Sequence, residues 1–458
     1  MKATAKRTVF TLGLAALLLF GLLTFVIRYF LYADRWVSFP GSPHVYSQSG
    51  ALETGRILDR SGVTLYTTGS SASYAKDAQT RKAMLHLTGD KAGNIPARVL
   101  RCYTSLLIGF DKLNGTYAME AGGGEIRTTL SAQVQGIALQ ALNGRKGTVG
   151  VYNYRTGEVL CAVSSPSFDP NDPPDVAGDT TGKYDGVYVY RFFHARYTPG
   201  SVFKLITTAA ALETVPGIAD ERFTCTGSLT VNGEQITCPK AHGEQSYAQA
   251  LANSCNCTFA QIAARTGAAE LTRKAEAAGV NSSLEIDGIR TARGSFDLTD
   301  ADDNSVAWAA IGQYTDLINP CQYMVWMGAV ANGGRAAVPV LVSQVKCGGS
   351  VRHTAEARQT DSMITPEAAR VLRGMMRNNV EQKYAAAQIP GLAICAKSGT
   401  AEVAGRASTA LFTGFVDSED YPLAFIVVVE EGGAGSSTCA PIAKTVLQAC
   451  VNVMKAER

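Results

Sequence analysis

A serine and a lysine three residues apart, Ser201 and Lys204, are the first side chains in this sequence that could do chemistry together. They lie in SVFKLITTAAALE, and on a helix this spacing places both on one face, where the amine can reach the hydroxyl. A serine hydroxyl is a weak nucleophile without a base. Lysine can be that base where burial and positive charge lower its pKa, and the apolar residues after Lys204 favour burial. The pair predicts acyl transfer through a serine ester, although S-x-x-K alone also occurs by chance in many helices.

Two further polar motifs follow along the chain. Ser254 and Asn256 interrupt the otherwise apolar stretch ALANSCNCTFAQIA. Taken alone, they are typical of a loop or cap between two helices. The other motif lies in an expected strand, where its glycine lets a ligand approach the backbone closely; its residues are Lys397, Ser398, Gly399 and Thr400. Taken alone, that motif is an ordinary strand with one exposed lysine.

Turn signals and apolar runs indicate the elements that must position these motifs. Apolar residues alternate on either side of Thr156-Gly157 in GTVGVYNYRTGEVLCAVSS, which predicts a β-hairpin. A break at residues 197–200 precedes a buried helix that begins at about Ser201. Three strands and a closing helix with Pro441 near its first turn are predicted from GLAICAKSGTAEV, ALFTGFVDSED, YPLAFIVVVEE and APIAKTVLQACVNVMKA. Together they predict an α+β fold with one mainly antiparallel sheet, flanking helices and an all-helical subregion.

An uncharged apolar run from Thr8 to Ile27 is long enough to cross a membrane as a helix. Basic residues precede it, namely Lys2, Lys6 and Arg7, so the positive-inside rule predicts a cytoplasmic N-terminus and an extracellular remainder. A cleaved signal peptide is the alternative, but the run exceeds a usual h-region and no A-x-A site follows it. We expect one uncleaved, single-pass anchor.

Three parts of the chain are predicted from this pattern. Residues 1–32 form a cytoplasmic stub and transmembrane helix, 33–145 a short membrane-proximal pedestal and 146–458 the catalytic domain. Within the pedestal, ETGRILDRSGVTLYTTG predicts two short strands around Ser61-Gly62. The catalytic domain is expected to begin near Gly147, where the hairpin pattern starts.

Composition excludes several classes of protein. With 458 residues, 46% hydrophobic and 18% charged, the chain can bury a core and is not mainly disordered. The 42 Lys and Arg nearly balance the 39 Asp and Glu, which leaves no basic field for nucleic acid. The five histidines accompany no G-x-S-x-G elbow, and no phosphate-binding G-x-x-x-x-G-K-[ST] is present. We expect no cofactor.

Eleven cysteines are an odd and large number. Cys225 and Cys238 flank a segment in which Asn232-Gly233 signals a hairpin turn, so a disulfide between them is one expectation, which the turn geometry must decide. Cys255 and Cys257 are two apart and no C-x-x-C occurs, which favours small buried residues over metal ligands. We therefore expect no metal site.

The order S-x-x-K, S-x-N, K-[ST]-G is the signature of penicillin-recognising serine enzymes, and the chain resembles the class B penicillin-binding proteins. GRILDRSGVTL resembles the family's membrane-proximal motif, and GEVLCAVSSPSFDPN resembles the start of its transpeptidase domain. Further matches occur in order at ARYTPGSVFK, HGEQSYAQALANSCNCTF, AKSGTAEV and ALFTGF. The chain departs from the family pattern at Ser398, usually threonine, and in IGQYTDLINPCQ at Tyr314 and Asn319.

The resemblance implies a peptidoglycan D,D-transpeptidase. Ser201 would be acylated by D-alanyl-D-alanine stem peptides and by β-lactams, with Lys204 as its base. Ser254 would relay a proton, Lys397 would tune that serine, and Asn256 would hold a substrate amide. Thr400 would contact the substrate carboxylate beside Ser398 and Gly399, and its N–H with that of Ser201 would form the oxyanion hole.

The resemblance also implies a membrane partner that polymerises glycan strands. Two other functions stay open: a membrane-anchored serine β-lactamase, which needs a base that activates water, and a β-lactam sensor, which needs a cytoplasmic output. Sequence alone does not assign the enzyme to elongation, division or sporulation.

Overall fold

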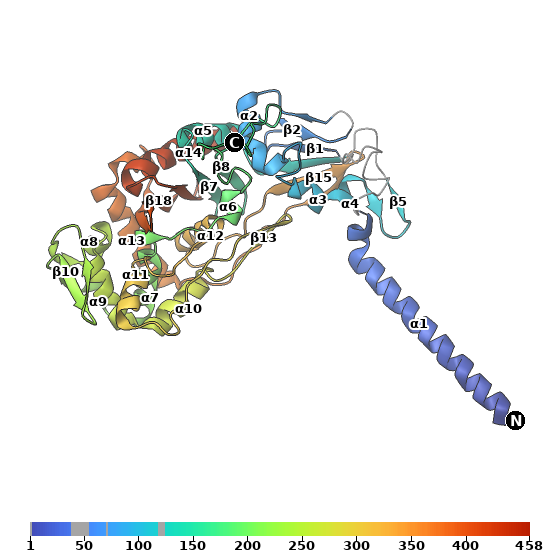
Figure 1. Ribbon diagram of the computed structural model, residues 1–458, viewed down its shortest axis with the longest axis horizontal. Helices are drawn as coiled ribbons and strands as arrows, with labels where there is room; N and C mark the ends of the chain where they lie inside the picture. Colours follow the sequence, from blue (N-terminus) through green and yellow to red (C-terminus); the bar gives the residue numbers. More distant parts are fainter. Residues whose placement is uncertain (1, 38–54, 70–71, 118–123) are drawn as a thin grey trace.

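The N-terminal helix α1 (Lys2–Val37) projects from an elongated body in the computed structural model, which describes residues 2–37, 55–69, 72–117 and 124–458 (Figure 1). Its apolar side chains are exposed along the shaft; Leu18 is 72% exposed and Phe10 71%. By length and composition, Thr4–Val37 could cross a membrane. Near its end, Tyr29 donates a hydrogen bond to the carbonyl of Lys112 at 2.7 Å. An uncovered apolar helix joined to a folded body is the architecture of a membrane-anchored protein.

A six-stranded sheet lies where α1 meets the body, in the order β16-β15-β6-β1-β2-β3 (Figure 1). Four of its strands come from the N-terminal part, namely β1 (Gly55–Leu58), β2 (Thr64–Thr67), β3 (Ser73–Tyr74) and β6 (Gly124–Thr128). The other two return from far downstream, as β15 (Val342–Cys347) and β16 (Ser350–Thr354). The two strands expected around Ser61-Gly62 are present as β1 and β2, whereas residues 38–54 lie outside the described part.

Asp59 explains the shape of the turn in GRILDRSGVTL. Its Oδ1 accepts backbone N–H bonds from Ser61 at 2.8 Å and Val63 at 2.9 Å. Its Oδ2 accepts one from Ala132 at 3.1 Å, at the start of α5 (Ala132–Leu142). One buried carboxylate thus closes the β1–β2 turn and joins it to the next helix. Short elements fill the space between, namely α2 (Ala78–Thr88), α3 (Arg98–Cys102), α4 (Thr104–Leu107), β4 (Phe110–Asp111) and β5 (Thr116–Tyr117).

The central sheet is fully antiparallel, in the order β17-β18-β19-β7-β8. The hairpin predicted around Thr156-Gly157 is present as β7 (Gly147–Asn153) and β8 (Val159–Ser165). The three late strands are β17 (Ile394–Val403), β18 (Arg406–Val416) and β19 (Leu423–Val429). Every residue of β7, β8 and β19 is buried, because helices cover both faces. The predicted α+β class is confirmed.

Alternate residues of the central strands enter two different cores. Val427 packs with α5 and α14 (Gly435–Ala456) on one face. Ile426 and Val428 pack with the opposite core, which contains the buried helix α12 (Pro320–Ala331). Successive side chains of each strand enter opposite cores, so both faces are apolar and the strand sequences are continuous apolar runs.

The closing helix starts earlier than the sequence indicates. It begins at Gly435, so Pro441 lies inside the helix instead of at its first turn. A Cβ at Gly435 would lie 2.1 Å from the carbonyl oxygen of Leu411 and 2.4 Å from that of Gly399. Glycine therefore lets the helix begin in direct contact with β17 and β18, which no local signal reveals.

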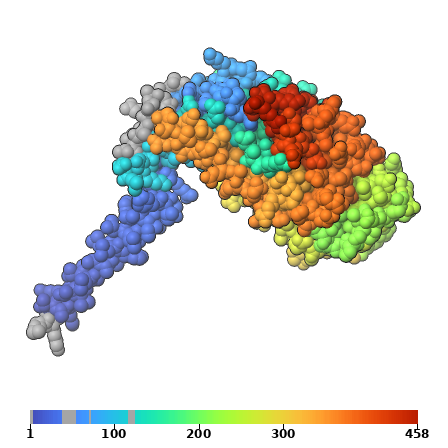
Figure 2. All heavy atoms as spheres, turned by 180° about the vertical axis from the view of Figure 1, so that it is seen from behind, coloured from blue at the N-terminus to red at the C-terminus, as the bar shows by residue number. Residues whose placement is uncertain are grey.

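Helices and short hairpins form the end of the body far from α1, coloured green to yellow in Figures 1 and 2. The Asn232-Gly233 turn is present with φ values of 46° and 83°, between β10 (Ser228–Val231) and β11 (Glu234–Thr237). The helices of this region are α7 (Lys204–Thr214), α8 (Tyr247–Ala252), α9 (Asn256–Thr266), α10 (Ala268–Ala277) and α11 (Asp303–Ala310). The helix α13 (Pro366–Lys383), orange in Figure 1, packs between α8 and β17. The remaining elements are α6 (Arg191–His194), β9 (Arg222–Cys225), β12 (Gly243–Ser246), β13 (Glu285–Ile286), β14 (Ile289–Arg290) and the 3₁₀ turns η1 (Gly200–Val202), η2 (Ile218–Asp220) and η3 (Ala385–Ala387).

Candidate active site

Ser201 lies in η1, the tight turn directly before α7. The turn is held from outside, because Gly200 N–H donates to the Gly312 carbonyl at 2.9 Å. Gly200 has φ of 53°, and a Cβ there would lie 2.6 Å from the carbonyl oxygen of Thr400. Glycine is needed at this position both for the left-handed backbone and for the close approach of β17.

Lys204, the first residue of α7, is completely buried. Its Nζ lies 2.9 Å from Ser201 Oγ, as the three-residue spacing predicts. The same nitrogen donates to the Ser254 carbonyl at 2.9 Å and to Asn256 Oδ1 at 2.7 Å, and it lies 3.2 Å from Ser254 Oγ. The ammonium or amine is thus surrounded by oxygen atoms from two motifs.

Ser254 occupies the junction between α8 and α9, with φ of 55°. The left-handed turn directs its carbonyl and its hydroxyl toward Lys204. Asn256 begins α9, and its Nδ2 donates to the Thr237 carbonyl at 2.8 Å, at the end of β11. The expected loop between two helices is therefore present, and it contacts the first motif.

Lys397 reaches the same cluster from β17 and is completely buried. Its Nζ lies 3.2 Å from Ser254 Oγ and donates to the Ser398 carbonyl at 2.7 Å. The hydroxyl of Ser398 donates to Tyr384 Oη at 2.9 Å. At Gly399, a Cβ would lie 2.9 Å from the Pro199 carbonyl oxygen, so this strand passes close beside the nucleophile turn. The motif is therefore not the ordinary strand with an exposed lysine that it suggests when taken alone, because Lys397 is buried.

Burial dominates the electrostatics of both lysines. It lowers the pKa of Lys204 well below its usual value, and the positive charge of Lys397 lowers that pKa further. Burial also lowers the pKa of Lys397, to about 7. Removing an ammonium group from water disfavours its charged form. Burial therefore favours the neutral form of Lys204, which is the form that can act as a base.

A cavity of about 700 Å³ opens above this cluster. Its lining includes Ser201, Ser254, Asn256, Ser398 and Thr400, so four of the predicted hydroxyls and one amide face the same space. The two lysines and Gly399 lie directly beneath or beside it through the contacts described above. The structure brings all eight predicted site residues together.

Sequence reasoning missed several residues that shape this site. Gly312 holds the nucleophile turn, and Tyr384 bonds Ser398. Asn319, noted above only as a departure from the family pattern, donates from Nδ2 to the carbonyls of Phe193 at 2.8 Å and Ala195 at 3.0 Å. The cavity is also lined by Trp308, His242 and Glu402. Only Asn319 gave a local signal, as an N-cap before Pro320.

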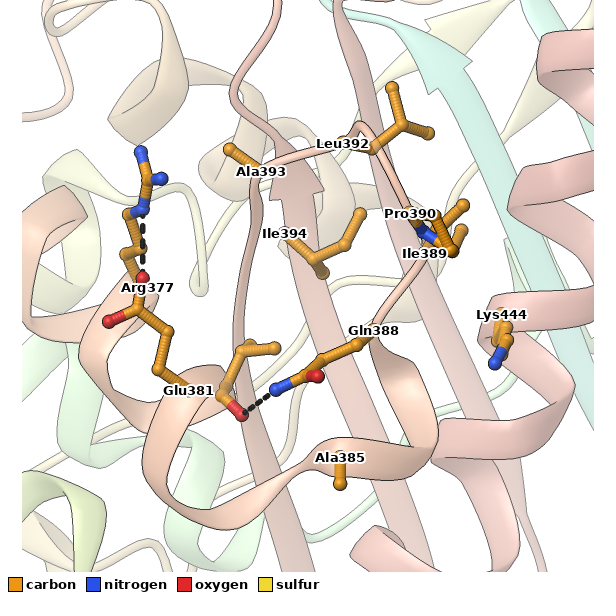
Figure 3. A pocket seen from close by; sticks show the side chains of 11 residues that line it. Arg377, Glu381, Ala385, Gln388, Ile389, Pro390, Leu392, Ala393, Ile394 and Lys444 are labelled. Atoms are coloured by element: carbon orange, nitrogen blue, oxygen red, sulfur yellow. Dashed lines mark hydrogen bonds and ion pairs between the residues drawn. The ribbon is translucent and has the colours of Figure 1, made fainter.

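A second groove, of about 470 Å³, lies between α13 and α14 (Figure 3). Arg377 and Glu381 pair on one side of it, and Gln388 donates to the Val380 carbonyl. None of the eight site residues lines this groove. Its side chains offer no serine or cysteine nucleophile, so the chemistry belongs to the cavity above Ser201.

Comparison with known proteins agrees with this geometry. Residues 147–448 match the penicillin binding protein transpeptidase domain. The chain is 28% identical over 360 residues to peptidoglycan D,D-transpeptidase PbpA of Mycobacterium tuberculosis, covering 72% of this chain and 73% of that protein. It is 26% identical over 358 residues to stage V sporulation protein D of Bacillus subtilis, covering 72% of this chain and 54% of that protein.

Solved structures show the same architecture. Penicillin-binding protein A from M. tuberculosis, solved as a ceftriaxone acyl-enzyme complex, superposes with a TM-score of 0.76 at 24% identity, covering 89% of this chain and 98% of that one. The D,D-transpeptidase domain from Eggerthella lenta gives a TM-score of 0.75 at 25% identity, with 88% and 98% covered. The match to the transpeptidase domain covers more than half of this chain, and the chain therefore belongs to the class B penicillin-binding protein transpeptidase family.

Proposed function

We propose that this protein is a membrane-anchored peptidoglycan D,D-transpeptidase in which Ser201 is the acylated nucleophile and Lys204 its general base. The observation that carries the proposal is the environment of one nitrogen atom. Lys204 Nζ is buried and lies 2.9 Å from Ser201 Oγ. A buried amine at hydrogen-bonding distance from a hydroxyl is the arrangement that an activated serine requires.

Counting protons on Lys204 supports the role of base. The Ser254 carbonyl and Asn256 Oδ1 can only accept hydrogen bonds. They lie 2.9 Å and 2.7 Å from Nζ and so take both N–H groups of a neutral amine. The lone pair is then left for the proton of Ser201, which the hydroxyl donates.

A path for that proton leads onward through Ser254. Its Oγ lies 3.2 Å from Lys204 Nζ and 3.2 Å from Lys397 Nζ. Ser254 also lines the cavity, where the leaving amine would stand. The proton that Lys204 takes from Ser201 can pass through the Ser254 hydroxyl to that amine, with Lys397 orienting the hydroxyl.

The reaction balances in two acyl transfers. Ser201 Oγ attacks the carbonyl carbon of the penultimate D-alanine, the bond to the terminal D-alanine breaks, and that D-alanine leaves with the relayed proton. The N–H groups of Ser201 and Thr400 stabilise the oxyanion, and the Thr400 hydroxyl, beside Ser398 and Gly399, contacts the substrate carboxylate. An amine from a second stem peptide then attacks the ester, forms the cross-link and returns a proton to Ser201. A β-lactam acylates the same oxygen, and its leaving group stays attached.

The same proposal covers the setting of the enzyme. Residues 1–32 are the cytoplasmic stub and anchor, residues 33–145 are the pedestal, and residues 146–458 are the extracellular catalytic domain. Two strands of the catalytic domain, β15 and β16, complete the sheet of the pedestal. The basic residues before the apolar run support this orientation. A membrane glycan polymerase is the expected partner. A structurally similar protein, PBP2 of Helicobacter pylori, was solved in a complex with MreC.

The test is covalent labelling of the full chain in detergent with a fluorescent penicillin, followed by intact-mass analysis. We expect one stable adduct at Ser201, none in Ser201→Ala, and normal labelling in Ser228→Ala, whose serine lies in β10. Lys204→Ala should lose at least about 100-fold in acylation rate, as general-base removal typically costs. The matched control is Lys240→Ala, an exposed lysine that lines the same cavity. Rapid turnover of the β-lactam would instead indicate a β-lactamase, and labelling of Ser201→Ala would remove Ser201 from its role.

A further inference from the structure

Three thiols and one imidazole converge beside the active-site cavity. Cys225 ends β9, Cys238 follows β11, His242 precedes β12, and Cys255 is the N-cap of α9. Their ligand atoms, three Sγ and one ring nitrogen, all lie within 4.8 Å of one another. Cys225 and Cys255 are buried, and the other two are half-buried. All eleven cysteines are free thiols, so the expected disulfide between Cys225 and Cys238 is not formed.

Two of the separations between these atoms match the edges of a metal-centred tetrahedron. Zinc binds sulfur at about 2.3 Å and nitrogen at about 2.0–2.1 Å, so tetrahedral geometry places two sulfurs about 3.8 Å apart and sulfur and nitrogen about 3.6 Å apart. The Sγ atoms of Cys238 and Cys255 are 3.8 Å apart. Cys225 Sγ and His242 Nδ1 are 3.4 Å apart. The remaining separations are at most 4.8 Å, so a single zinc ion can reach all four ligand atoms.

Backbone N–H groups already surround the sulfurs as they do around bound thiolates. Cys238 Sγ accepts from the N–H of Asn256 at 3.1 Å and of Cys257 at 3.5 Å. Cys255 Sγ accepts from the N–H of Thr258 at 3.4 Å. These donors belong to the first turn of α9, whose positive dipole end favours negative charge. Such outer contacts orient metal ligands and support their charge.

We propose that Cys225, Cys238, His242 and Cys255 bind one zinc ion, with each thiol losing its proton on binding. Three sulfurs and one nitrogen are a ligand set typical of closed, structural zinc sites. The spacing along the chain predicts no metal site, because no C-x-x-C is present. The ligands instead come from the ends of three separate elements and the loop before β12, which only the fold brings together.

The position of Cys255 gives the ion a consequence for the reaction. Cys255 stands between Ser254 and Asn256, which both supply oxygen atoms to Lys204. Cys238 and His242 lie on the loop after β11, which also lines the cavity. The ion would join this loop to the α8–α9 junction and so act as a positioning element, without contacting the reacting atoms.

The test begins with the metal content of the full chain, purified in detergent under reducing conditions and measured by mass spectrometry for elements. We expect one zinc per chain. Replacement by Co²⁺ should give the visible absorption of a tetrahedral thiolate site. Each of Cys225→Ser, Cys238→Ser, Cys255→Ser and His242→Asn should weaken zinc binding at least about tenfold in competition with a chelating dye, since loss of even an outer contact costs that much.

Cys257→Ser is the matched control, because this neighbouring buried thiol bonds the Ile236 carbonyl at 3.7 Å and lies outside the four-ligand set. It should retain the ion. Removal of zinc by a chelator should lower the melting temperature and slow acylation by a fluorescent penicillin, and added Zn²⁺ should restore both. If a cysteine variant fails to fold, His242→Asn, which alters a half-buried side chain, still decides the matter.

Three results would overturn the proposal. The chain could retain no zinc while its thiols remain free; its mass could show that Cys238 pairs with Cys255 or Cys257 as a disulfide; or the four ligand variants could bind zinc as tightly as the unchanged chain. A ligand-to-metal absorption band that survives in His242→Asn and Cys225→Ser would have the same meaning.

Discussion

Gly200→Ala tests whether contact between the nucleophile turn and β17 sets the geometry of Ser201. The new methyl carbon would lie 2.6 Å from the Thr400 carbonyl oxygen and 3.0 Å from its carbon. Restoring an ordinary contact requires a displacement of roughly 0.5–1 Å. A misplacement of about 1 Å can cost a catalytic step about 100-fold. We therefore expect the acylation rate constant to fall about 10- to 100-fold, equivalent to about 1.4–2.7 kcal/mol.

The matched control is Gly217→Ala, in the segment between the end of α7 and the turn η2. Gly217 also has a positive φ, 73°, but nothing lies within 4 Å of its Cβ position. Both variants carry the left-handed strain of about 1–2 kcal/mol, and only Gly200→Ala carries the collision. The assay is the second-order rate of labelling by a fluorescent penicillin, with thermal melting to compare stability. Labelling of Gly200→Ala within about threefold of the unchanged chain, a difference of less than about 1 kcal/mol, would refute the reasoning.

Two further predictions concern buried charge. Lys204 must be neutral to act as a base, so the acylation rate should fall as the pH drops below the pKa of Lys204. Lys397→Met removes a positive charge that lowers this pKa, and the acid limb of the pH–rate profile should therefore move to higher pH. An acid limb that does not move would argue against coupling of the two lysines. Lys274 Nζ pairs with Glu213 at 2.5 Å, with the two side chains only 2% and 7% exposed. Lys274→Ala should destabilise the fold by about 3–5 kcal/mol in denaturant unfolding, as loss of one partner from a buried pair does. Arg273→Ala, whose half-exposed side chain faces the same carboxylate at 3.5 Å, should cost less than about 1 kcal/mol, and equal losses would contradict the reasoning.

Local spacing was enough to predict the features that one segment determines alone. The contact between Ser201 and Lys204 follows from three residues on one helical face. The Asn232-Gly233 and Thr156-Gly157 turns were readable because positive φ limits the residues that a tight hairpin accepts. The length of the apolar run in α1 was enough to predict a helix that could cross a membrane. Motif order then connected these segments to a family and to eight site residues.

Contacts between distant segments depended on packing and were decided by the tertiary structure alone. The resemblance implied that Lys397 acts on Ser254, but only the fold shows that the two meet across 143 residues of chain and that Lys397 is completely buried, which lowers its pKa. Likewise, the start of α14 at Gly435 depends on carbonyl groups of β17 and β18, and the thiol cluster depends on where β9, β11 and α9 end. The sequence by itself determines contacts between residues that are close along the chain. The burial of a side chain and the contacts between distant elements arise only when the whole core forms. The chemistry of this site depends on both kinds of contact.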